Sequence, residues 1–337
     1  MNKWNKLLLV ALTLQIGLVF LVRSKSATTT VQKRAVLLPG FDVDKVDAIR
    51  VFDQTENADD TRNESLVVDL QKVNGEWIVA SAFGYPAKQS KIDEFLEQVA
   101  TLDARRPLVQ SANKHANLEV AADQYERKVE IVSGGDTTTL FIGLAAGSNR
   151  TALRINDENA VYGVQGFGAR TAAATVRPWI EQNYLGLEKG DIAKATFATS
   201  SGLITITPFQ TKSGTQDWKV TLDDKPIKIG PNQRVDSQHI RTVMNSIRAI
   251  KVHKPVANKP GKVLATIVLD LKPAQSANGE SSIPPEQLQL EITETDAEGN
   301  FFFAKEKSRG AILTESDELS DLVKLSLKNL LAEKQEK

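Results

Sequence analysis

The residue types that carry acid–base, nucleophilic or metal chemistry are scarce in this chain. Its 337 residues include no cysteine and three histidines, His115, His239 and His253. No two of these histidines stand four residues apart, the spacing at which a helix offers two ligands to one metal ion. Without cysteine, thiolate nucleophiles, disulfides and thiolate-bound zinc are excluded. We therefore predict no metal site and no cofactor, and we expect His239 and His253 on the solvated surface.

Paired carboxylates are the remaining candidates for hydrolytic chemistry. They occur at Asp59–Asp60 and at Asp223–Asp224, both in polar, loop-like stretches. Adjacent aspartates in such stretches are typical of turns, because their side chains bond the nearby backbone. A hydrolase is therefore the least favoured of the function classes that stay open.

Two loops each match part of a known ligand-binding motif. "GLAAGSNRT" (143–151) has spaced glycines but lacks the Lys-Ser/Thr pair of a phosphate-binding loop, and we expect a turn. "FDVDKVD" (41–47) has spaced aspartates, but Asp47 stands where a calcium-binding EF-hand loop requires glycine. The sequence thus predicts no catalytic residue and a protein that is not an enzyme.

The N-terminal segment has the features of a membrane anchor. Leu7–Val22 carries no charge, and basic residues flank it on both sides. As a helix it spans about 24 Å, slightly less than a hydrocarbon core of about 30 Å, and the flanking cations can reach outward. We predict a cytoplasmic N-terminus at 1–6, a transmembrane signal anchor at 7–23 and a polar tether at 24–40. A cleaved signal peptide and a buried soluble helix are the alternatives.

The composition describes a folded body without affinity for nucleic acid. Hydrophobic residues make up 41% and charged residues 25%, as in ordinary globular proteins. Lys plus Arg and Asp plus Glu both number 42, so the net charge is zero. A neutral chain gains little from binding phosphate backbones. The length suits two domains.

The body contains the same pattern twice. "KIDEFLEQVATLDARRPL" (91–108) and "HIRTVMNSIRAIKVHKPV" (239–256) have apolar residues at identical increments, with each pair 148 positions apart. The pattern is the apolar stripe of an amphipathic helix with one buried face. A tryptophan strand precedes each helix, "NGEWIV" (74–79) in one copy and "TQDWKV" (215–220) in the other.

Strand-like and turn-like segments complete the two copies. A first strand is expected at 46–52 and at 191–197, and hairpins turn at Gly134–Gly135 and at 156–159. In the second copy strands are expected at 264–271, 288–307 and 311–315, although the two tails do not align strand for strand. Helices are expected around 169–185 and around 318–332.

These segments predict an α+β fold. An N-terminal transmembrane helix is followed by two tandem α/β repeats, at 41–186 and 187–337, each a mainly antiparallel sheet with packed helices. Trp77 and Trp218 are expected in the core, with a sugar-stacking surface as the alternative.

Four cations follow the two helices at matched places. They are Arg105, Arg106, Lys251 and Lys254. A cation in the last turn of a helix complements the helix dipole, which is one interpretation. The other is contact with a partner protein or an anionic lipid, and these four residues are the candidate partner contacts.

Four segments together resemble a known family. "LLPGFDVDKVDAIRVF", "NGEWIV", "YPAKQSKIDEFLEQVATLDARRPL" and "TTTLFIGLAAGSNRTALRINDENAVYGV" are similar to the domain-of-unknown-function 4340 family, over roughly residues 36–190 and more faintly in the second copy. The resemblance implies a bacterial envelope protein with one N-terminal span, encoded beside ABC-2 type exporters and gliding-type auxiliary transport proteins. It implies no catalytic residues.

We therefore expect a non-enzymatic accessory protein of an ABC-type export complex. Residues 7–23 would hold it in the bacterial inner membrane, with the globular part in the periplasm and contacting transporter permease or auxiliary subunits. The alternative from another class is a periplasmic ligand-binding protein that holds a glycan or lipid-linked intermediate between the two copies.

Overall fold

The computed structural model describes most of the body of the chain. The described residues are 35–56, 62–104, 106–147, 149–188, 191–257, 261–272, 286–295, 298–306 and 309–334, together with Trp4, Leu12 and Gln15. The predicted anchor at 7–23 lies outside them except for Leu12 and Gln15, and the predicted tether lies outside them up to residue 34. In the described part of the chain, no helix has the length and apolar character to cross a membrane.

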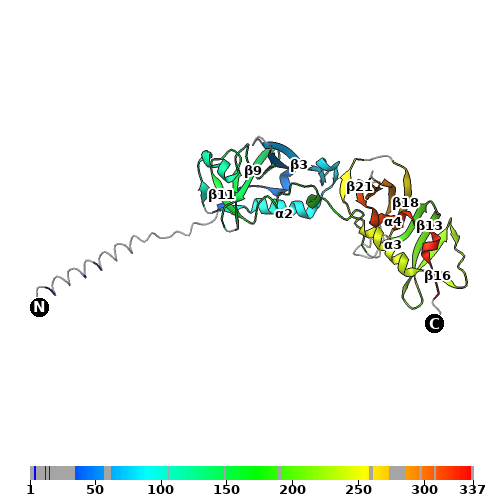
Figure 1. Cartoon of the computed structure of the whole chain (residues 1–337). Helices are drawn as coiled ribbons and strands as arrows, with labels where there is room; N and C mark the ends of the chain where they lie inside the picture. The colour runs from blue at the N-terminus through cyan, green and yellow to red at the C-terminus, as the bar shows by residue number, and fades with distance from the viewer. Residues whose placement is uncertain are drawn as a thin grey trace.

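Two nine-stranded antiparallel sheets form the body, one in each half of the chain (Figure 1). The first has the order β5-β4-β3-β2-β8-β9-β10-β11-β7, and the second has the order β15-β14-β13-β12-β18-β19-β20-β21-β17. The two orders are the same when strands are counted within each half. We call the described residues up to 186 the first unit and those from 187 the second unit. The predicted pair of mainly antiparallel sheets is confirmed.

The strands of the two sheets have the following bounds. In the first unit they are β2 (Val46–Glu56), β3 (Arg62–Val73), β4 (Glu76–Val79), β5 (Tyr85–Pro86), β7 (Pro107–Val109), β8 (Arg127–Ser133), β9 (Asp136–Ala145), β10 (Arg150–Ile155) and β11 (Val161–Gln165). In the second unit they are β12 (Ile192–Thr199), β13 (Gly202–Gln210), β14 (Gln216–Leu222), β15 (Lys225–Pro226), β17 (Lys254–Val256), β18 (Val263–Leu271), β19 (Gln287–Thr295), β20 (Phe301–Glu306) and β21 (Gly310–Glu315).

The remaining elements are helices and two small ladders. The α-helices are α2 (Gln89–Ala100), α3 (Ser237–Ala249) and α4 (Ser316–Val323). The 3-10 helices are η1 (Val43–Lys45), η2 (Ala80–Ala82), η3 (Ala112–Lys114), η4 (Ala116–Leu118), η5 (Arg177–Trp179) and η6 (Leu327–Leu330). The ladders pair β1 (Ala35–Val36) with β6 (Asp103–Ala104) and β16 (Gln233–Val235) with β22 (Leu331–Glu333).

The predicted helical stripes face the core in both units. The buried side chains are Ile92, Phe95, Leu96 and Val99 in α2 and Ile240, Val243, Met244 and Ile247 in α3. The tryptophan strands also occupy equivalent places, since β4 and β14 are each second from the edge of their sheet. Trp77 and Trp218 are 6% and 8% exposed, so both are core residues as predicted.

The helix predicted around 169–185 is wrong. This segment consists of turns and the short η5, which contains Pro178. Proline removes a backbone donor and disfavours a helix interior. The segment's backbone bonds instead reach distant parts of the chain: Lys88 N–H donates to the Trp179 carbonyl at 2.7 Å and Tyr184 N–H donates to the Ile250 carbonyl at 2.9 Å. Long-range pairing therefore replaces the helix.

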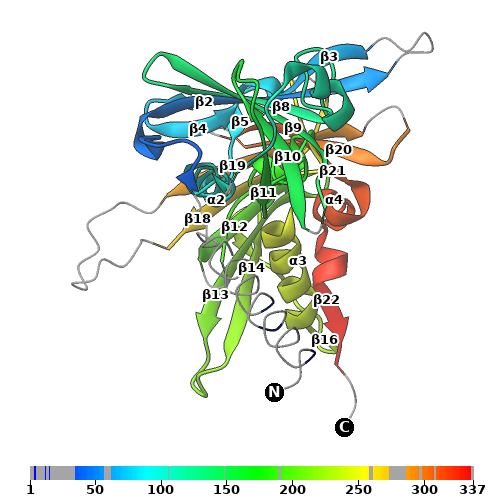
Figure 2. The same cartoon turned by 90° about the vertical axis from the view of Figure 1, so that its left-hand side faces the viewer.

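The terminal helix predicted around 318–332 is shorter than expected. It ends at Val323, and η6 and β22 follow. The Asp236 N–H donates to the Leu330 carbonyl at 2.9 Å, which places β22 against β16 just before α3. Helix α4 also packs beside α3 (Figure 2). Pairing with β16 takes the backbone groups that a longer helix would have used.

The basic stretches after the helices become edge strands. The α-helices end at Ala100 and Ala249, and Pro107 and Pro255 then lie in β7 and β17, each at the end of its sheet. Proline is tolerated there because an edge strand need not donate on both sides. Arg106, Lys251 and Lys254 lie beyond the last helical turn, so the helix-dipole interpretation of these cations is wrong.

Buried Tyr184 ties the last residues of the first unit to the second sheet. The Tyr184 hydroxyl donates to the Gly310 carbonyl at 2.5 Å and accepts from the Glu306 N–H at 2.5 Å. Arg309 Nη1 donates to the Tyr184 carbonyl at 3.0 Å. Burial raises the pKa of Tyr184 above its usual value, so the hydroxyl stays protonated.

Gly143 sits where a side chain has no room. In β9, an added Cβ would lie 2.0 Å from the Leu118 carbonyl oxygen and 2.6 Å from that of Glu119. The start of "GLAAGSNRT" is therefore a strand crossed closely by another backbone segment. The expected turn is confined to the residues around Gly147, whose φ is 91°.

We predict that Tyr184→Phe lowers the free energy of unfolding by about 1–3 kcal/mol, because it removes the two hydrogen bonds that the Tyr184 hydroxyl makes with the Gly310 carbonyl and the Glu306 N–H, each worth about 0.5–1.5 kcal/mol. Urea denaturation of the full-length protein in neutral detergent measures this change. Tyr162→Phe is the matched control, since the half-buried Tyr162 hydroxyl makes no hydrogen bond with the other described residues. Equal losses in the two variants would contradict the assigned role.

We also predict that Gly143→Ala lowers the free energy of unfolding by at least about 1–3 kcal/mol, the usual range for overpacking. The control is Gly261→Ala, where the new Cβ would sit 3.5 Å from Thr293 Cβ, an ordinary contact. Thermal unfolding of both variants provides the comparison. A Gly143→Ala protein as stable as the control would show that the approach of residues 118–120 is not tight.

Candidate functional site

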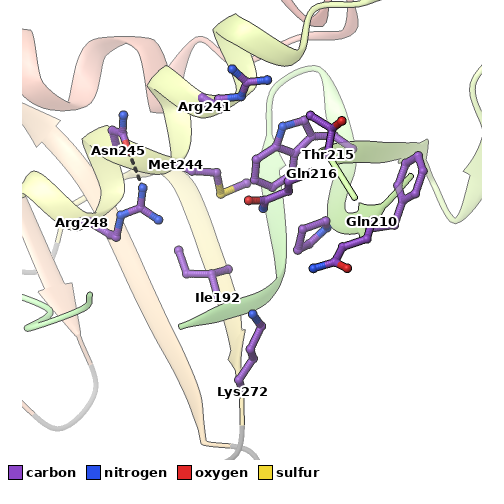
Figure 3. Close-up of a pocket in the computed structure, with 12 residues that line it drawn as sticks. Ile192, Gln210, Thr215, Gln216, Arg241, Met244, Asn245, Arg248 and Lys272 are labelled. Carbon is purple, nitrogen blue, oxygen red and sulfur yellow. Dashed lines mark hydrogen bonds between the residues drawn. The ribbon is translucent and has the colours of Figure 1, made fainter. Parts of the chain in front are cut away.

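A groove of about 790 Å³ lies in the second unit between α3 and the β13–β14 hairpin (Figure 3). We call it the α3 groove. Figure 3 shows Met244 and Ile192 near its centre, with Gln210, Thr215 and Gln216 on the hairpin side. The lining residues are Ile192, Pro208, Phe209, Gln210, Thr215, Gln216, Trp218, Arg241, Met244, Asn245, Arg248 and Lys272. The sheet, one helix and the residue after β18 thus all contribute to one site.

The hairpin wall exists because β13 and β14 continue past the tryptophan. Trp218 faces Pro208 across the ladder, and pairing continues to Gln210 and Gln216. Thr211 N–H then donates to the Thr215 carbonyl at 2.9 Å and closes the tip. In the first unit, the ladder between β3 and β4 ends at the pair Val73–Glu76, one residue from Trp77. The chain turns directly after this pair. The second unit therefore has a wall that the first lacks.

Helix α3 is fixed to β14 at its N-terminus. Asp236 caps the helix by accepting from the N–H groups of Gln238 and His239 at 3.1 and 3.0 Å. Ser237 Oγ donates to Asp217 Oδ1 at 2.6 Å. This bond joins the first residue of the helix to the residue before Trp218, so it sets the width of the groove at that end.

The shared fold does not require the polar residues that α3 contributes to the groove. The positions of Arg241 and Arg248, counted back by the 148-residue repeat, carry Asp93 and Ala100 in α2. Asn245 likewise corresponds to Glu97. Both helices bury equivalent stripes, so the same packing tolerates opposite charge on the outer face. Arg241 and Arg248 therefore have no cationic counterpart at the matching positions of α2.

The groove is positive and partly apolar. Arg241, Arg248 and Lys272 contribute charge, and the lining contains no aspartate, glutamate or histidine. Arg248 donates to Asn245 Oδ1. The side chains of Arg241 and Lys272 have no carboxylate partner among the described residues. Cations beside buried Trp218 and Met244 suit a ligand that is both anionic and apolar, and the lining offers no general base.

The candidate partner contacts lie elsewhere. Arg105 is outside the described residues, and the exposed Arg106 lines a second cavity, of about 720 Å³, together with Arg150 in the first unit. Lys251 donates to Asn183 Oδ1, and Lys254 is exposed on β17. The structure therefore does not gather these residues in the α3 groove. Their role as partner contacts stays a prediction.

The groove was missed from the sequence although one signal was available. Arg241 and Arg248 stand seven residues apart around Met244, a spacing that places both on one side of the helix. Such a pair is common on solvated helix faces. This pair differs from an ordinary one because the matching positions of the first copy carry no positive charge. That comparison can be made from the sequence alone.

The histidines and paired aspartates have ordinary surroundings. His253 is exposed as predicted, with its ring centroid 4.4 Å from that of Phe301, whereas His239 is half-buried. His115 is buried, with Nε2 3.0 Å from the Asn159 carbonyl oxygen. Within the described ranges, no group of three or more His, Asp or Glu side chains could hold a metal ion.

Asp223 and Asp224 lie in the turn between β14 and β15. Their φ angles of 47° and 60° are left-handed, and Asp223 Oδ1 accepts from the Leu203 N–H at 3.1 Å. Aspartate tolerates this conformation and stabilises turns by such bonds. The turn expected here is confirmed. Asp59 and Asp60 lie outside the described residues.

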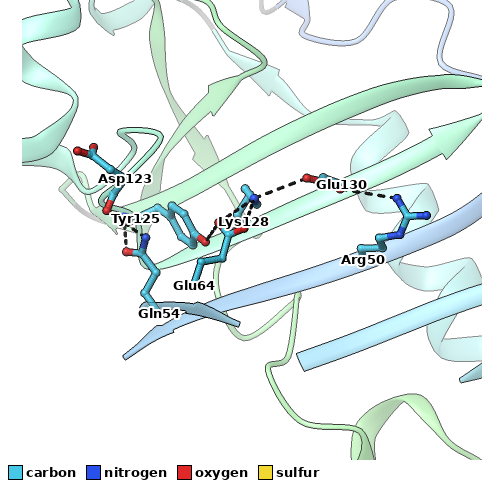
Figure 4. Close-up of polar contacts among 7 residues, drawn as sticks. All are labelled: Arg50, Gln54, Glu64, Asp123, Tyr125, Lys128 and Glu130. Carbon is cyan, nitrogen blue, oxygen red and sulfur yellow. Dashed lines mark hydrogen bonds and ion pairs between the residues drawn. The ribbon is translucent and has the colours of Figure 1, made fainter. Parts of the chain in front are cut away.

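A charged network covers part of the first sheet (Figure 4). Glu64 accepts hydrogen bonds from Tyr125 and from Lys128 Nζ, the latter at 2.8 Å. Lys128 and Arg50 also lie 3.6 and 3.8 Å from Glu130. Burial alone would raise the pKa of Glu64, but the bonds from Lys128 and Tyr125 hold it below its usual value. The charged groups pair with one another. The network therefore stabilises strand pairing and does not favour a charged ligand.

Comparison with known protein families matches residues 77–270 to the family described as Domain of unknown function (DUF4340). The match covers more than half of the chain and includes β13, β14 and α3, so it reaches further into the second unit than the sequence resemblance suggested. Neither the curated proteins nor the solved structures give a significant match. The chain belongs to the domain-of-unknown-function 4340 family.

Proposed function

We propose that this protein is a non-enzymatic accessory protein of a bacterial ABC-type export complex. In this proposal residues 7–23 anchor it in the inner membrane and the two units lie in the periplasm. The α3 groove is the observation that carries the proposal, because it is a lined hollow with cations that only one of two units sharing a fold carries on its helix. Family membership and the uncharged Leu7–Val22 segment support the envelope setting.

The composition of the groove supports binding over turnover. General acid–base catalysis needs a side chain whose pKa lies near the working pH, within reach of the transferred proton. The groove supplies guanidinium, ammonium, amide, hydroxyl and apolar groups. Arginine holds its charge at every physiological pH and provides a fork of donors for an oxyanion. These groups can hold and orient an anionic partner.

The alternative of a ligand-binding protein gains support from Trp218 and Phe209 beside the cations. The place differs from the expected one, since the groove lies within the second unit and not between the copies. The two roles are compatible, because an accessory subunit can hold a ligand for the complex. The hydrolase alternative gains no such support, because Asp223 and Asp224 line neither this groove nor another described cavity.

We predict that the full-length protein, purified from detergent-solubilised membranes of its native host, brings with it the ATPase and permease subunits of an exporter. The control is residues 1–34 fused to an unrelated soluble domain, which keeps the apolar segment and loses both units. Mass spectrometry of the two purifications gives the comparison. Equal recovery of transporter subunits with the control would show that the body makes no specific contact.

We predict that protease added to spheroplasts degrades the two units, while intact cells protect them. Immunoblotting with an antibody against the second unit follows the loss. A cytoplasmic protein serves as the internal control for intact inner membranes. Survival of the units in spheroplasts would place the body on the cytoplasmic side and refute the proposed orientation.

A further inference from the structure

An apolar cavity adjoins the α3 groove across two aromatic side chains. It measures about 460 Å³ and lies beside the hairpin formed by β14 and β15. Its lining residues are Thr207, Phe209, Trp218, Lys219, Val220, Pro226, Ile227, Ile229 and Val235. Phe209 and Trp218 also line the α3 groove, so the two hollows border each other at these two residues.

Apolar surface remains exposed in this apolar cavity. Phe209 is 47% exposed and Ile229 is 46% exposed, although both are large hydrophobic side chains. Removing apolar surface from water is favourable by roughly 25 cal/mol per Å². A ligand that covers these two residues would therefore gain free energy from the hydrophobic effect, independently of charge.

The two hollows differ in character. The α3 groove holds Arg241, Arg248 and Lys272, whereas Lys219 is the one charged residue lining the apolar cavity. Each volume falls within the range of about 300–1,000 Å³ typical of small-molecule sites. A free phosphate would leave most of this space empty, and a neutral lipid would leave the three cations of the groove unpaired.

We infer that the α3 groove and the apolar cavity form one composite site for an anionic phospholipid-like amphiphile. A phosphate headgroup would lie between the cations of the α3 groove, and a hydrocarbon chain would pass along Phe209 and Trp218 into the apolar cavity. The inference rests on the proposed role of the α3 groove as a binding site, and it names the chemical class of the ligand.

The charge distribution selects an anionic headgroup over a zwitterionic one. A choline headgroup would bring a cation into a hollow that already contains three and no carboxylate. Guanidinium groups bond phosphate oxygens with two parallel donors, which strengthens an anionic contact. The equivalent helix of the first unit carries Asp93 and Ala100 in place of Arg241 and Arg248, so the shared fold does not require these two charges.

Native mass spectrometry of the full-length protein in neutral detergent tests the inference. The probes are dioctanoyl phosphatidic acid, dioctanoyl phosphatidylcholine and inorganic phosphate. We expect phosphatidic acid to bind at least about tenfold more tightly than either of the others, as charged hydrogen bonds and apolar burial together require. The preference over phosphatidylcholine should shrink as ionic strength rises.

Two variants separate the two parts of the site. Arg241→Ala with Arg248→Ala should weaken phosphatidic acid binding at least about tenfold and weaken phosphatidylcholine binding by a smaller factor, because the choline cation already opposes binding beside the arginines. Phe209→Ser should weaken phosphatidic acid and leave phosphate unchanged. Arg241, Phe209 and the control Lys324 are exposed, so folding should survive, and thermal unfolding checks this. Lys324→Ala, on a residue that lines neither hollow, should behave as wild type.

Equal affinity for phosphate and phosphatidic acid would overturn the apolar part of the site, and equal affinity for the two lipids would overturn the anionic part. Loss in Lys324→Ala matching that of the double arginine variant would overturn the location. Failure of the transporter purification leaves these affinities untouched and refutes the export role alone. Failure of the lipid series with successful purification refutes only the inferred ligand.

Discussion

Both units depend on burying one apolar stripe of a single helix in the core shared with an antiparallel sheet. Four side chains of α2 and four of α3 do this at equivalent positions, and a buried tryptophan on the second strand from the edge accompanies each helix. This constraint fixes the inner face of the helix and leaves the outer face free. Asp93 and Arg241 occupy matching outer positions with opposite charge. Function can therefore diverge on that face at little cost to the fold.

The elements that were predicted correctly are those specified by local periodicity. The stripes of α2 and α3, the strands around Trp77 and Trp218 and the turn at Gly134–Gly135 all follow from residues close in sequence. The segment 169–185 could not be predicted in this way. Its backbone partners are Lys88 and Ile250, far away in the chain, and those bonds outweigh a helical pattern interrupted by proline.

The α3 groove escaped prediction for the same reason. Arg241, Gln210 and Lys272 belong to a helix, a hairpin and a strand exit, and each alone is an ordinary solvated residue. Only the sheet order brings them to one hollow. The four candidate cations, in contrast, attracted notice because they are neighbours in sequence after each helix, and the structure gives Arg106 and Lys251 separate surroundings.

A longer hairpin between β13 and β14 is the difference between the two units that shapes the α3 groove. Strand β3 turns directly into β4, which spans Glu76–Val79, whereas β14 spans Gln216–Leu222 and begins two residues before Trp218. Extending a surface hairpin costs little closure entropy, because that cost grows only slowly with loop length. The added residues raise a wall opposite the outer face of α3 and leave Phe209 exposed between two hollows. A packed sheet edge thus becomes a lined site while the core around Trp218 stays closed.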